Sequence, residues 1–191
     1  MLCIKNARLS FPHLFEAAPE SQSAGAKLVY SAVFLVPKNS DMAKVIMAEI
    51  KNVATAKWGA KADDILKQLY QQDRICLHDG NTKKYDGYAN CFYINAKDKA
   101  RPLVLDRDRT PLVESDGKPY AGCYVNAMVE FWAMDNQYGK RINCCLKGVQ
   151  FARDGDSFTG GSVASRDDFE DLSIDEVDQA LGSNNPVDNF L

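Results

Sequence analysis

Two segments in the second half of the chain constrain the fold more than any other feature, because both alternate between apolar and mixed positions. In CYVNAMVEFWAM (123–134), every second side chain is apolar, as expected for a strand with one buried face. In RINCCLKGVQF (141–151), the alternation puts Ile142, Cys144 and Leu146 on the buried side. A short connection joins the two segments, so we predict a hairpin of antiparallel strands that share a core face.

Four further segments are predicted to be strands. The segment KLVYSAVFLVP (27–37) is apolar at both alternating sets of positions, which predicts burial on both faces. Pro12 is expected to end the first strand and Pro37 the second, because proline donates no ladder hydrogen bond. The four predicted strands cover residues 2–11, 27–37, 91–97 and 100–106.

A helical insertion is predicted near residues 40–70. Ser40 is a suitable N-cap, and the apolar residues that follow it recur every three or four positions. A second, shorter helix is predicted over 62–70, and the turn-rich segment 75–90 is expected to be a loop. Short strands around one helical insertion favour a mostly β fold. An OB-type barrel fits this order, although several small β folds share the pattern.

The charges are distributed unevenly along the chain. Its net charge is −3, but eight of its 26 acidic residues lie within 167–191, which contains no Lys or Arg. Residues 1–166 therefore hold 18 acids against all 23 bases, a net charge of +5. This asymmetry indicates an acidic tail on a domain with anionic partners, and a tail that only confers solubility is the alternative. The tail residues assigned to partner binding are Asp167, Asp168, Glu170, Asp171, Asp175, Glu176, Asp178, Asp188, Phe190 and Leu191.

A stretch rich in Gly and Ser, SFTGGSVAS (157–165), is typical of a flexible linker. We predict a barrel domain over residues 1–156, a linker over 157–166 and a disordered acidic tail over 167–191. The N-terminal residues lack the apolar core and cleavage site of a signal peptide. No apolar run reaches the roughly 18 residues of a membrane helix. We therefore expect a cytosolic chain with reduced cysteines.

Patterns typical of an enzyme or a metal protein are missing. The six cysteines form no Cys-x-x-Cys pair, and the two histidines, His13 and His78, lie far apart. We therefore predict neither a metal site nor a cofactor. Phosphate-binding glycine loops and the usual hydrolase motifs do not occur. Asp106 and Asp108 are a carboxylate pair that a metal-dependent nuclease could use, but surface charge is the simpler explanation of the pair.

The predicted strands carry aromatic and basic side chains on the faces opposite their core faces. The aromatic residues on these faces are Tyr93, Tyr124 and Trp132. Single-stranded nucleic acid requires such a combination, because bases stack on the rings at about 1–3 kcal/mol per base while Lys and Arg contact the phosphates. The alternative is that Tyr124 and Trp132 pack under a loop or at a dimer interface. The predicted phosphate contacts are Lys97, Lys99, Arg101, Arg141 and Lys147.

Two longer segments resemble a bacteriophage protein family. NARLSFPHLFEA (6–17) and GKPYAGCYVNAMVEFWAMDNQYGKRINCCLKGVQFARDGDSFTGG (117–161) are similar to phage single-stranded-DNA-binding proteins of OB fold, long catalogued only as a domain of unknown function. The resemblance implies a non-enzymatic protein that coats single strands without sequence preference in phage replication or recombination. Related single-strand binders have acidic tails that end in an aromatic residue. Here Phe190 is penultimate and Leu191 is the last residue.

The resemblance also implies the partners and the location of the chain. The body is expected to bind single-stranded DNA, and the tail to bind replication or recombination proteins, in the cytoplasm of the infected bacterial host. Because the linker keeps the tail close to the basic body, the tail is also expected to compete with DNA. The alternatives are a protein-interaction hub of a replication complex and, with less support, a nuclease. The oligomeric state is open, with a homo-oligomer among the alternatives.

Overall fold

The predicted hairpin is present in the structure, a computed structural model that describes residues 1–158. β6 (Tyr124–Asn136) pairs antiparallel with β7 (Gly139–Arg153). The alternating apolar positions face the core, where Val129 and Leu146 are almost completely buried. The hairpin and the direction of its core face are therefore confirmed.

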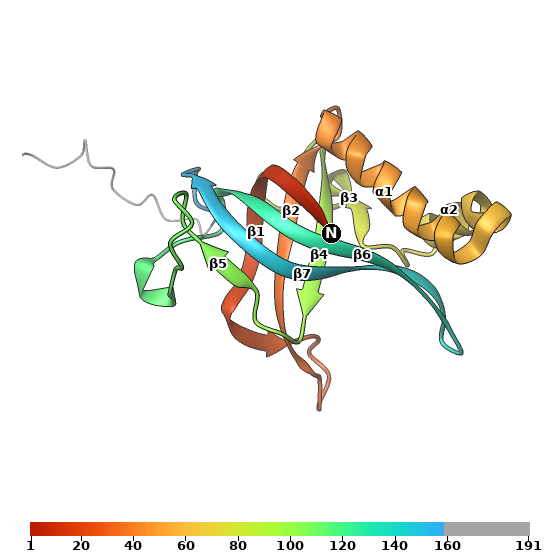
Figure 1. Ribbon diagram of the computed structural model, residues 1–191, viewed down its shortest axis with the longest axis horizontal. Helices are drawn as coiled ribbons and strands as arrows, with labels where there is room; N and C mark the ends of the chain where they lie inside the picture. Colours follow the sequence, from red (N-terminus) through yellow and green to blue (C-terminus); the bar gives the residue numbers. More distant parts are fainter. Residues whose placement is uncertain (159–191) are drawn as a thin grey trace, which may run out of the picture. The chain divides into compact units, whose positions relative to one another are not determined.

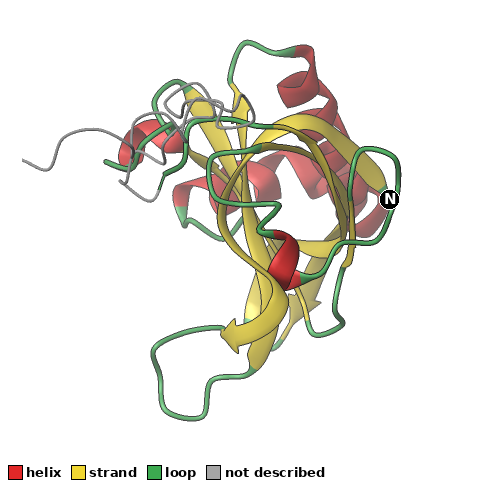
Figure 2. Cartoon of the chain, turned by 90° about the vertical axis from the view of Figure 1, so that its left-hand side faces the viewer, coloured by secondary structure: helices red, strands yellow, loops and turns green. Residues whose placement is uncertain are grey.

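Seven strands form one sheet within residues 1–158, in the order β3-β4-β2-β1-β6-β7-β5. Ile142 of β7 also forms a parallel bridge with Ile75, and the N–H of Cys76 donates to the carbonyl of Ile142 at 3.0 Å. These contacts close the sheet into a barrel (Figure 2) with the strand sequence of an OB fold. The remaining strands are β1 (Leu2–Pro19), β2 (Leu28–Pro37), β3 (Leu77–Asp79), β4 (Cys91–Asp98) and β5 (Leu103–Leu105).

The helical insertion lies between β2 and β3, as predicted. It consists of α1 (Asp41–Trp58) and α2 (Ala62–Gln71), shown beside the barrel in Figure 1. Ser40 is the N-cap of α1, and its Oγ accepts a hydrogen bond from the N–H of Ala43 at 3.2 Å. The inner face of α1 joins the core of the barrel, so the insertion extends the core. Within residues 1–158, three short 3₁₀ helices complete the secondary structure: η1 (Gly59–Lys61), η2 (Gly80–Thr82) and η3 (Glu114–Asp116).

The first strand does not end at Pro12, as the sequence suggested, but continues to Pro19. The register of β1 on β2 shifts between Ser10 and His13, so Pro12 lies in a bulge where no ladder hydrogen bond from its nitrogen is required. Phe11, directly before it, has a φ of 45°. The prediction was wrong because the bulge results from pairing with β2, which the local sequence does not reveal.

Two other predictions need smaller corrections. The segment 75–90 is not only a loop, because it contains β3 and η2. The strand predicted over 100–106 is reduced to β5, which pairs parallel with β7. The prediction for β2 is confirmed, since Phe34 on one face and Leu35 on the other are both buried.

All the described residues belong to one compact unit. The predicted acidic tail over 167–191 lies outside the described residues, and so does the predicted linker over 157–166 except for Ser157 and Phe158. Phe158 packs on the barrel, and its N–H donates to the carbonyl of Ala121 at 3.0 Å. Neither helix of residues 1–158 is long and apolar enough to cross a membrane.

Candidate nucleic-acid interface

The outer face of β1, β2 and β4 brings together residues that are far apart in the sequence. The strand register aligns one residue of β1, one of β2 and one of β4 in each of two adjacent rows. The outer face is therefore continuous across three strands, as in the surface that OB folds use for oligonucleotides. The rows are Ser10, Val33 and Asn95, followed by His13, Ser31 and Lys97.

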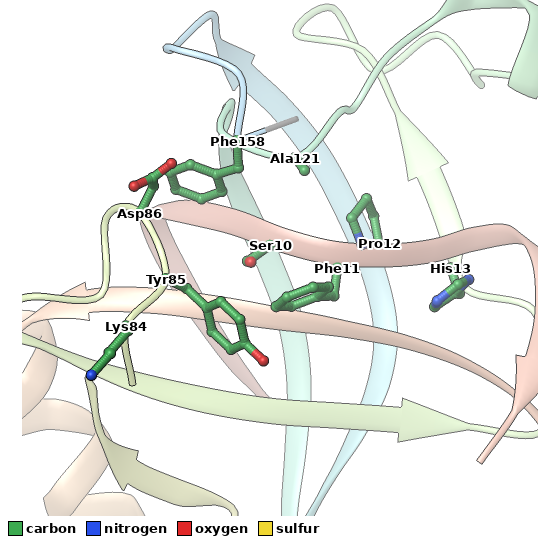
Figure 3. Close-up of a pocket in the computed structure, with 9 residues that line it drawn as sticks. All are labelled: Ser10, Phe11, Pro12, His13, Lys84, Tyr85, Asp86, Ala121 and Phe158. Atoms are coloured by element: carbon green, nitrogen blue, oxygen red, sulfur yellow. The ribbon is translucent and has the colours of Figure 1, made fainter. Parts of the chain in front are cut away.

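Two exposed aromatic rings lie beside these rows. The side chain of Phe11 is 51% exposed and that of Tyr85 is 56% exposed. The two rings meet edge to face, with their centroids 5.3 Å apart and their planes at 73° (Figure 3). The bulge at Pro12 turns Phe11 outward, and a loop that follows η2 carries Tyr85. The pair therefore joins a strand to a loop.

Tyr88 holds this loop on the sheet. Its ring is buried against Leu35 and Tyr93, and its hydroxyl donates to Ser10 Oγ at 3.3 Å. Burial raises the pKa of Tyr88 above its ordinary value. Gly80 at the start of η2 also fits closely, because a Cβ at this position would lie 2.2 Å from the carbonyl oxygen of Tyr88. These contacts position Tyr85 without burying it.

Phe11 borders two adjoining cavities, and Tyr85 borders one of them. One, of about 410 Å³, lies between Phe11, Tyr85, Lys84 and Phe158, and the other, of about 340 Å³, extends towards Lys97. Phe11 and His13 line both cavities, so the two form one depression. We refer to this surface as the aromatic groove, defined by Phe11, His13, Lys84, Tyr85 and Lys97.

Basic residues gather at the end of the groove next to the loop between β1 and β2. Lys97 forms an ion pair with Glu20, and this contact lowers the pKa of the Glu20 carboxyl, with smaller contributions from Lys27 and Lys99. Arg101 places its guanidinium 5.8 Å from the centre of the Phe15 ring. Of the predicted phosphate contacts, Lys97 and Lys99 are thus both close to Glu20, whereas Arg101 contacts Phe15, a ring that packs against the core. Lys27, Lys97 and Lys99 outnumber the Glu20 carboxylate that they surround, which suits an anionic ligand.

The chemistry of the groove suits a chain of planar, anionic units. Exposed rings offer π-faces to planar groups, and the lysines at the edges attract negative charge. No group of three or more His, Cys, Asp or Glu side chains within residues 1–158 is placed to hold a metal ion. The exposed rings and the lysines are the features of the groove that suit such a ligand.

Tyr93, predicted to stack on a base, lies on the outer face of β4 but is only 8% exposed. His78 stacks on its ring at 4.7 Å between centroids, Tyr88 packs beside it at 5.4 Å, and the Nζ of Lys83 lies 5.9 Å from its centre. The loop and His78 cover the ring, so Tyr93 is not the exposed stacking surface that the sequence predicted. In this arrangement, Tyr93 supports the loop that carries Tyr85.

The other predicted residues lie on strands β6 and β7. Trp132 is 41% exposed and pairs across the hairpin with Asn143. Arg141 is exposed as well, whereas Lys147 is paired with Asp98 at 2.8 Å. These residues form a surface distinct from the aromatic groove. Tyr124 lies at the start of β6, where the guanidinium of Arg153 is 3.4 Å from the ring centre.

The carboxylates considered for a nuclease have structural roles. Asp106 pairs with Lys118 at 2.9 Å, and this contact lowers the pKa of its carboxyl. The Oδ1 of Asp108 accepts a hydrogen bond from the N–H of Thr110 at 2.9 Å. Both carboxylates therefore stabilise the turn after β5.

Sequence reasoning missed Phe11 and Tyr85, the exposed rings of the groove. Phe11 is the last residue of the strand predicted over 2–11, because nothing in the local sequence signals the bulge at Pro12. Tyr85 lies in the loop predicted over 75–90, although it directly follows Lys83 and Lys84. A ring next to two lysines is the combination that single-stranded nucleic acid requires, and this signal could have been recognised.

An OB barrel with exposed rings and cations on its β1–β2–β4 face defines a class of protein, the OB-fold binders of single-stranded nucleic acid. Sequence comparison then places the protein within this class. The chain belongs to the family described as Enterobacter phage Enc34 ssDNA-binding protein, whose model matches residues 1–181. The expected family is confirmed. Its members are binding proteins, so the chain is not an enzyme.

One relative is closely similar over nearly the whole chain. The putative protein p50 of Acyrthosiphon pisum secondary endosymbiont phage 1 is 48% identical over 186 residues, which cover 94% of this chain and 98% of that protein. The similarity extends beyond the residues that the structure describes.

Solved structures agree on the fold. The single-stranded DNA-binding protein from bacteriophage Enc34, in complex with ssDNA, superposes with a TM-score of 0.67 at 26% identity, covering 82% of this chain and 88% of that chain. The T7 single-stranded DNA binding protein gp2.5 gives a TM-score of 0.52 at 13% identity, covering 87% and 89% of the two chains. This second similarity shows the fold alone.

Proposed function

We propose that the protein binds single-stranded DNA without sequence preference through the aromatic groove. The observation that carries the proposal is the pair of exposed rings, Phe11 and Tyr85, on the outer face of the β1–β2–β4 sheet. Stacking on rings tolerates any base, since every base has a π-face. Membership of the Enc34 family and the structural similarity to a protein solved with ssDNA support this choice of ligand.

The basic residues of the groove make the binding depend on salt. Each phosphate neutralised by Lys or Arg releases counterions, and the affinity for single strands falls with a slope of about −0.7 per contact on logarithmic axes. Lys97, Lys99 and Arg101 are assigned to these contacts. Fluorescence anisotropy with labelled oligo-dT and with a duplex of equal length, at several salt concentrations, tests the proposal. Equal affinity for the duplex would contradict it.

A second surface for the strand is the outer face of β6 and β7. The exposed ring of Trp132, with Arg141 and Lys147 nearby on β7, supports this candidate. It predicts that Trp132→Ala weakens binding of oligo-dT. A Trp132→Ala protein with wild-type affinity would remove this surface from the DNA path.

The biological role proposed is DNA replication or recombination of a phage, in the cytoplasm of the infected host. Eight carboxylates within 167–191 follow a body of net charge +5, which supports a tail that competes with DNA for the basic groove. When DNA occupies the groove, the tail is released and presents Phe190 and Leu191 to replication or recombination proteins. Affinity capture with the full chain and with residues 1–166, with and without oligo-dT, tests this recruitment.

A further inference from the structure

Another cavity lies along β1, outside the aromatic groove, and we refer to it as the second cavity. It measures about 410 Å³ and has an apolar floor that includes Leu35 and Met42. Three basic side chains, Lys5, Arg8 and Arg153, line it, and none of the residues that line it is acidic. A cavity of this size with three cations and no lining carboxylate favours an anionic ligand.

Two of these cations are held in place by their neighbours. The Nε of Arg8 donates to the carbonyl of Gly122 at 3.1 Å, and its Nη2 donates to the carbonyl of Asp156 at 2.9 Å. The guanidinium of Arg153 stacks on Tyr124 at 3.4 Å from the ring centre. The carboxylate of Asp156 lies 4.0 Å from the Nη2 of Arg8 and is fully exposed. The guanidinium groups are therefore oriented before any ligand arrives.

Arg8 connects this cavity to the aromatic groove. Its guanidinium lies 4.3 Å from the centre of the Phe158 ring, and Phe158 lines the groove side. On the other side, Gly87 lines the second cavity, and a Cβ at Gly87 would lie only 2.6 Å from the Phe158 ring. Arg8, Phe158 and Gly87 thus form a common wall between the two cavities.

The strand β1 runs beneath both cavities. Asn6 and Arg8 line the second cavity, whereas Ser10 and Phe11 line the groove. At about 3.3 Å per residue, Asn6 and Phe11 are at most roughly 16 Å apart along the strand. This separation is short enough for one extended single strand to span, since OB folds engage about 4–16 nucleotides.

We propose that the pocket of Lys5, Arg8 and Arg153 is a second phosphate-binding subsite for the strand that occupies the aromatic groove. This inference rests on the proposed function of the groove. The ligand is an internal phosphodiester of a strand long enough to cross the wall at Arg8 and Phe158. Short oligonucleotides fill only the groove, and longer ones reach Lys5 and Arg153.

The test measures affinity against oligonucleotide length. Oligo-dT from about 4 to 16 nucleotides, without terminal phosphates, is titrated against the full-length protein and its Lys5→Gln and Arg153→Gln variants at several salt concentrations. Lys67→Gln is the matched control, because Lys67 is exposed on α2. For the longest strands, each variant is expected to lower the slope of affinity against salt by about 0.7, whereas the shortest strands are unaffected.

The outcomes separate this inference from the proposed function. Slopes for Lys5→Gln and Arg153→Gln that match the control at every length would overturn the second subsite, and so would an equal loss at short and long lengths. Lys5→Gln by itself is sufficient for this decision, since Lys5 is exposed and its replacement leaves the stack of Arg153 on Tyr124 intact. If the groove itself does not bind DNA, the Phe11→Gly and Tyr85→Ala proteins bind every length as tightly as the wild type does.

Discussion

Phe11 combines two properties that a purely structural residue rarely has. Its φ of 45° lies in the left-handed region, which a bulky side chain adopts only at a cost of about 1–3 kcal/mol. Its ring is nevertheless half exposed, so burial compensates little of that cost. A strained and exposed aromatic residue at this position supports the proposed contact between Phe11 and the ligand.

This argument predicts that Phe11→Gly does not destabilise the fold. Glycine adopts a positive φ without strain, so the free energy of unfolding should stay equal or increase. Phe34→Ala, in contrast, empties a fully buried site and should cost about 3–5 kcal/mol. Urea denaturation of both variants checks the comparison. A loss of more than about 2 kcal/mol for Phe11→Gly would show that Phe11 is a core residue after all.

Cys123 offers a test of burial by chemistry. Burial raises the pKa of its thiol to about 11. At pH 8 only about one in a thousand folded molecules carries the reactive thiolate there. We expect iodoacetamide to spare Cys123 in native protein at pH 8 and to modify all six cysteines in urea, as read by mass spectrometry. Alkylation of Cys123 in native protein at the rate seen in urea would contradict its burial.

The same shift has a consequence for stability. The folded chain keeps the Cys123 proton up to a pH of about 11, whereas the unfolded chain releases it near the ordinary thiol pKa of 9.0. The folded chain is therefore stabilised by holding this proton. That contribution to the free energy of unfolding is complete below pH 9 and is lost as the pH rises towards 11.

At the scale of elements, the sequence predicts the elements that local patterns define and misses those that long-range contacts define. The β6–β7 hairpin and α1 were predictable, because the period-two alternation and the cap at Ser40 are local signals. The path of β1 through Pro12 was not, since the bulge depends on pairing with β2. The position of Tyr85 was not predictable either. The loop that carries it is held by the Tyr88–Ser10 hydrogen bond, which joins residues 78 positions apart.

The cap of α1 gives a prediction at this scale. Ser40→Ala removes the acceptor of the Ala43 N–H and should lower the free energy of unfolding by about 1 kcal/mol. Ser23→Ala, in the exposed loop between β1 and β2, should change it by less than about 0.5 kcal/mol. Urea melts of the two variants provide the measurement. Equal stabilities would argue against the observed start of α1.

At the scale of the whole molecule, the central feature is the division of charge between body and tail. A net charge of +5 in residues 1–166 adjoins eight acids in residues 167–191. A flexible linker can give a tail an effective concentration near millimolar. At that concentration, a tail that binds the groove only weakly would still compete with DNA. The opposite charges of the two parts are the basis of the proposed competition between the tail and DNA.

This division predicts how truncation affects binding. The protein ending at Arg166 should bind oligo-dT more tightly than the full chain, with the largest difference at low salt where charges are least screened. A full-length variant with the eight tail acids replaced by their amides is the matched control and should behave like the truncation. Unchanged or weaker affinity on truncation would leave the competing tail without support.

The central claim is that the aromatic groove binds single-stranded DNA, and one titration tests it most directly. Labelled oligo-dT is titrated by anisotropy against wild type, Phe11→Gly and Tyr85→Ala, with Tyr138→Ala as control because this ring is 72% exposed at the tip of the β6–β7 hairpin. Each groove variant is expected to lose about 1–3 kcal/mol of binding free energy, while the control stays near wild type. Wild-type affinity in both groove variants would contradict the assignment of this face.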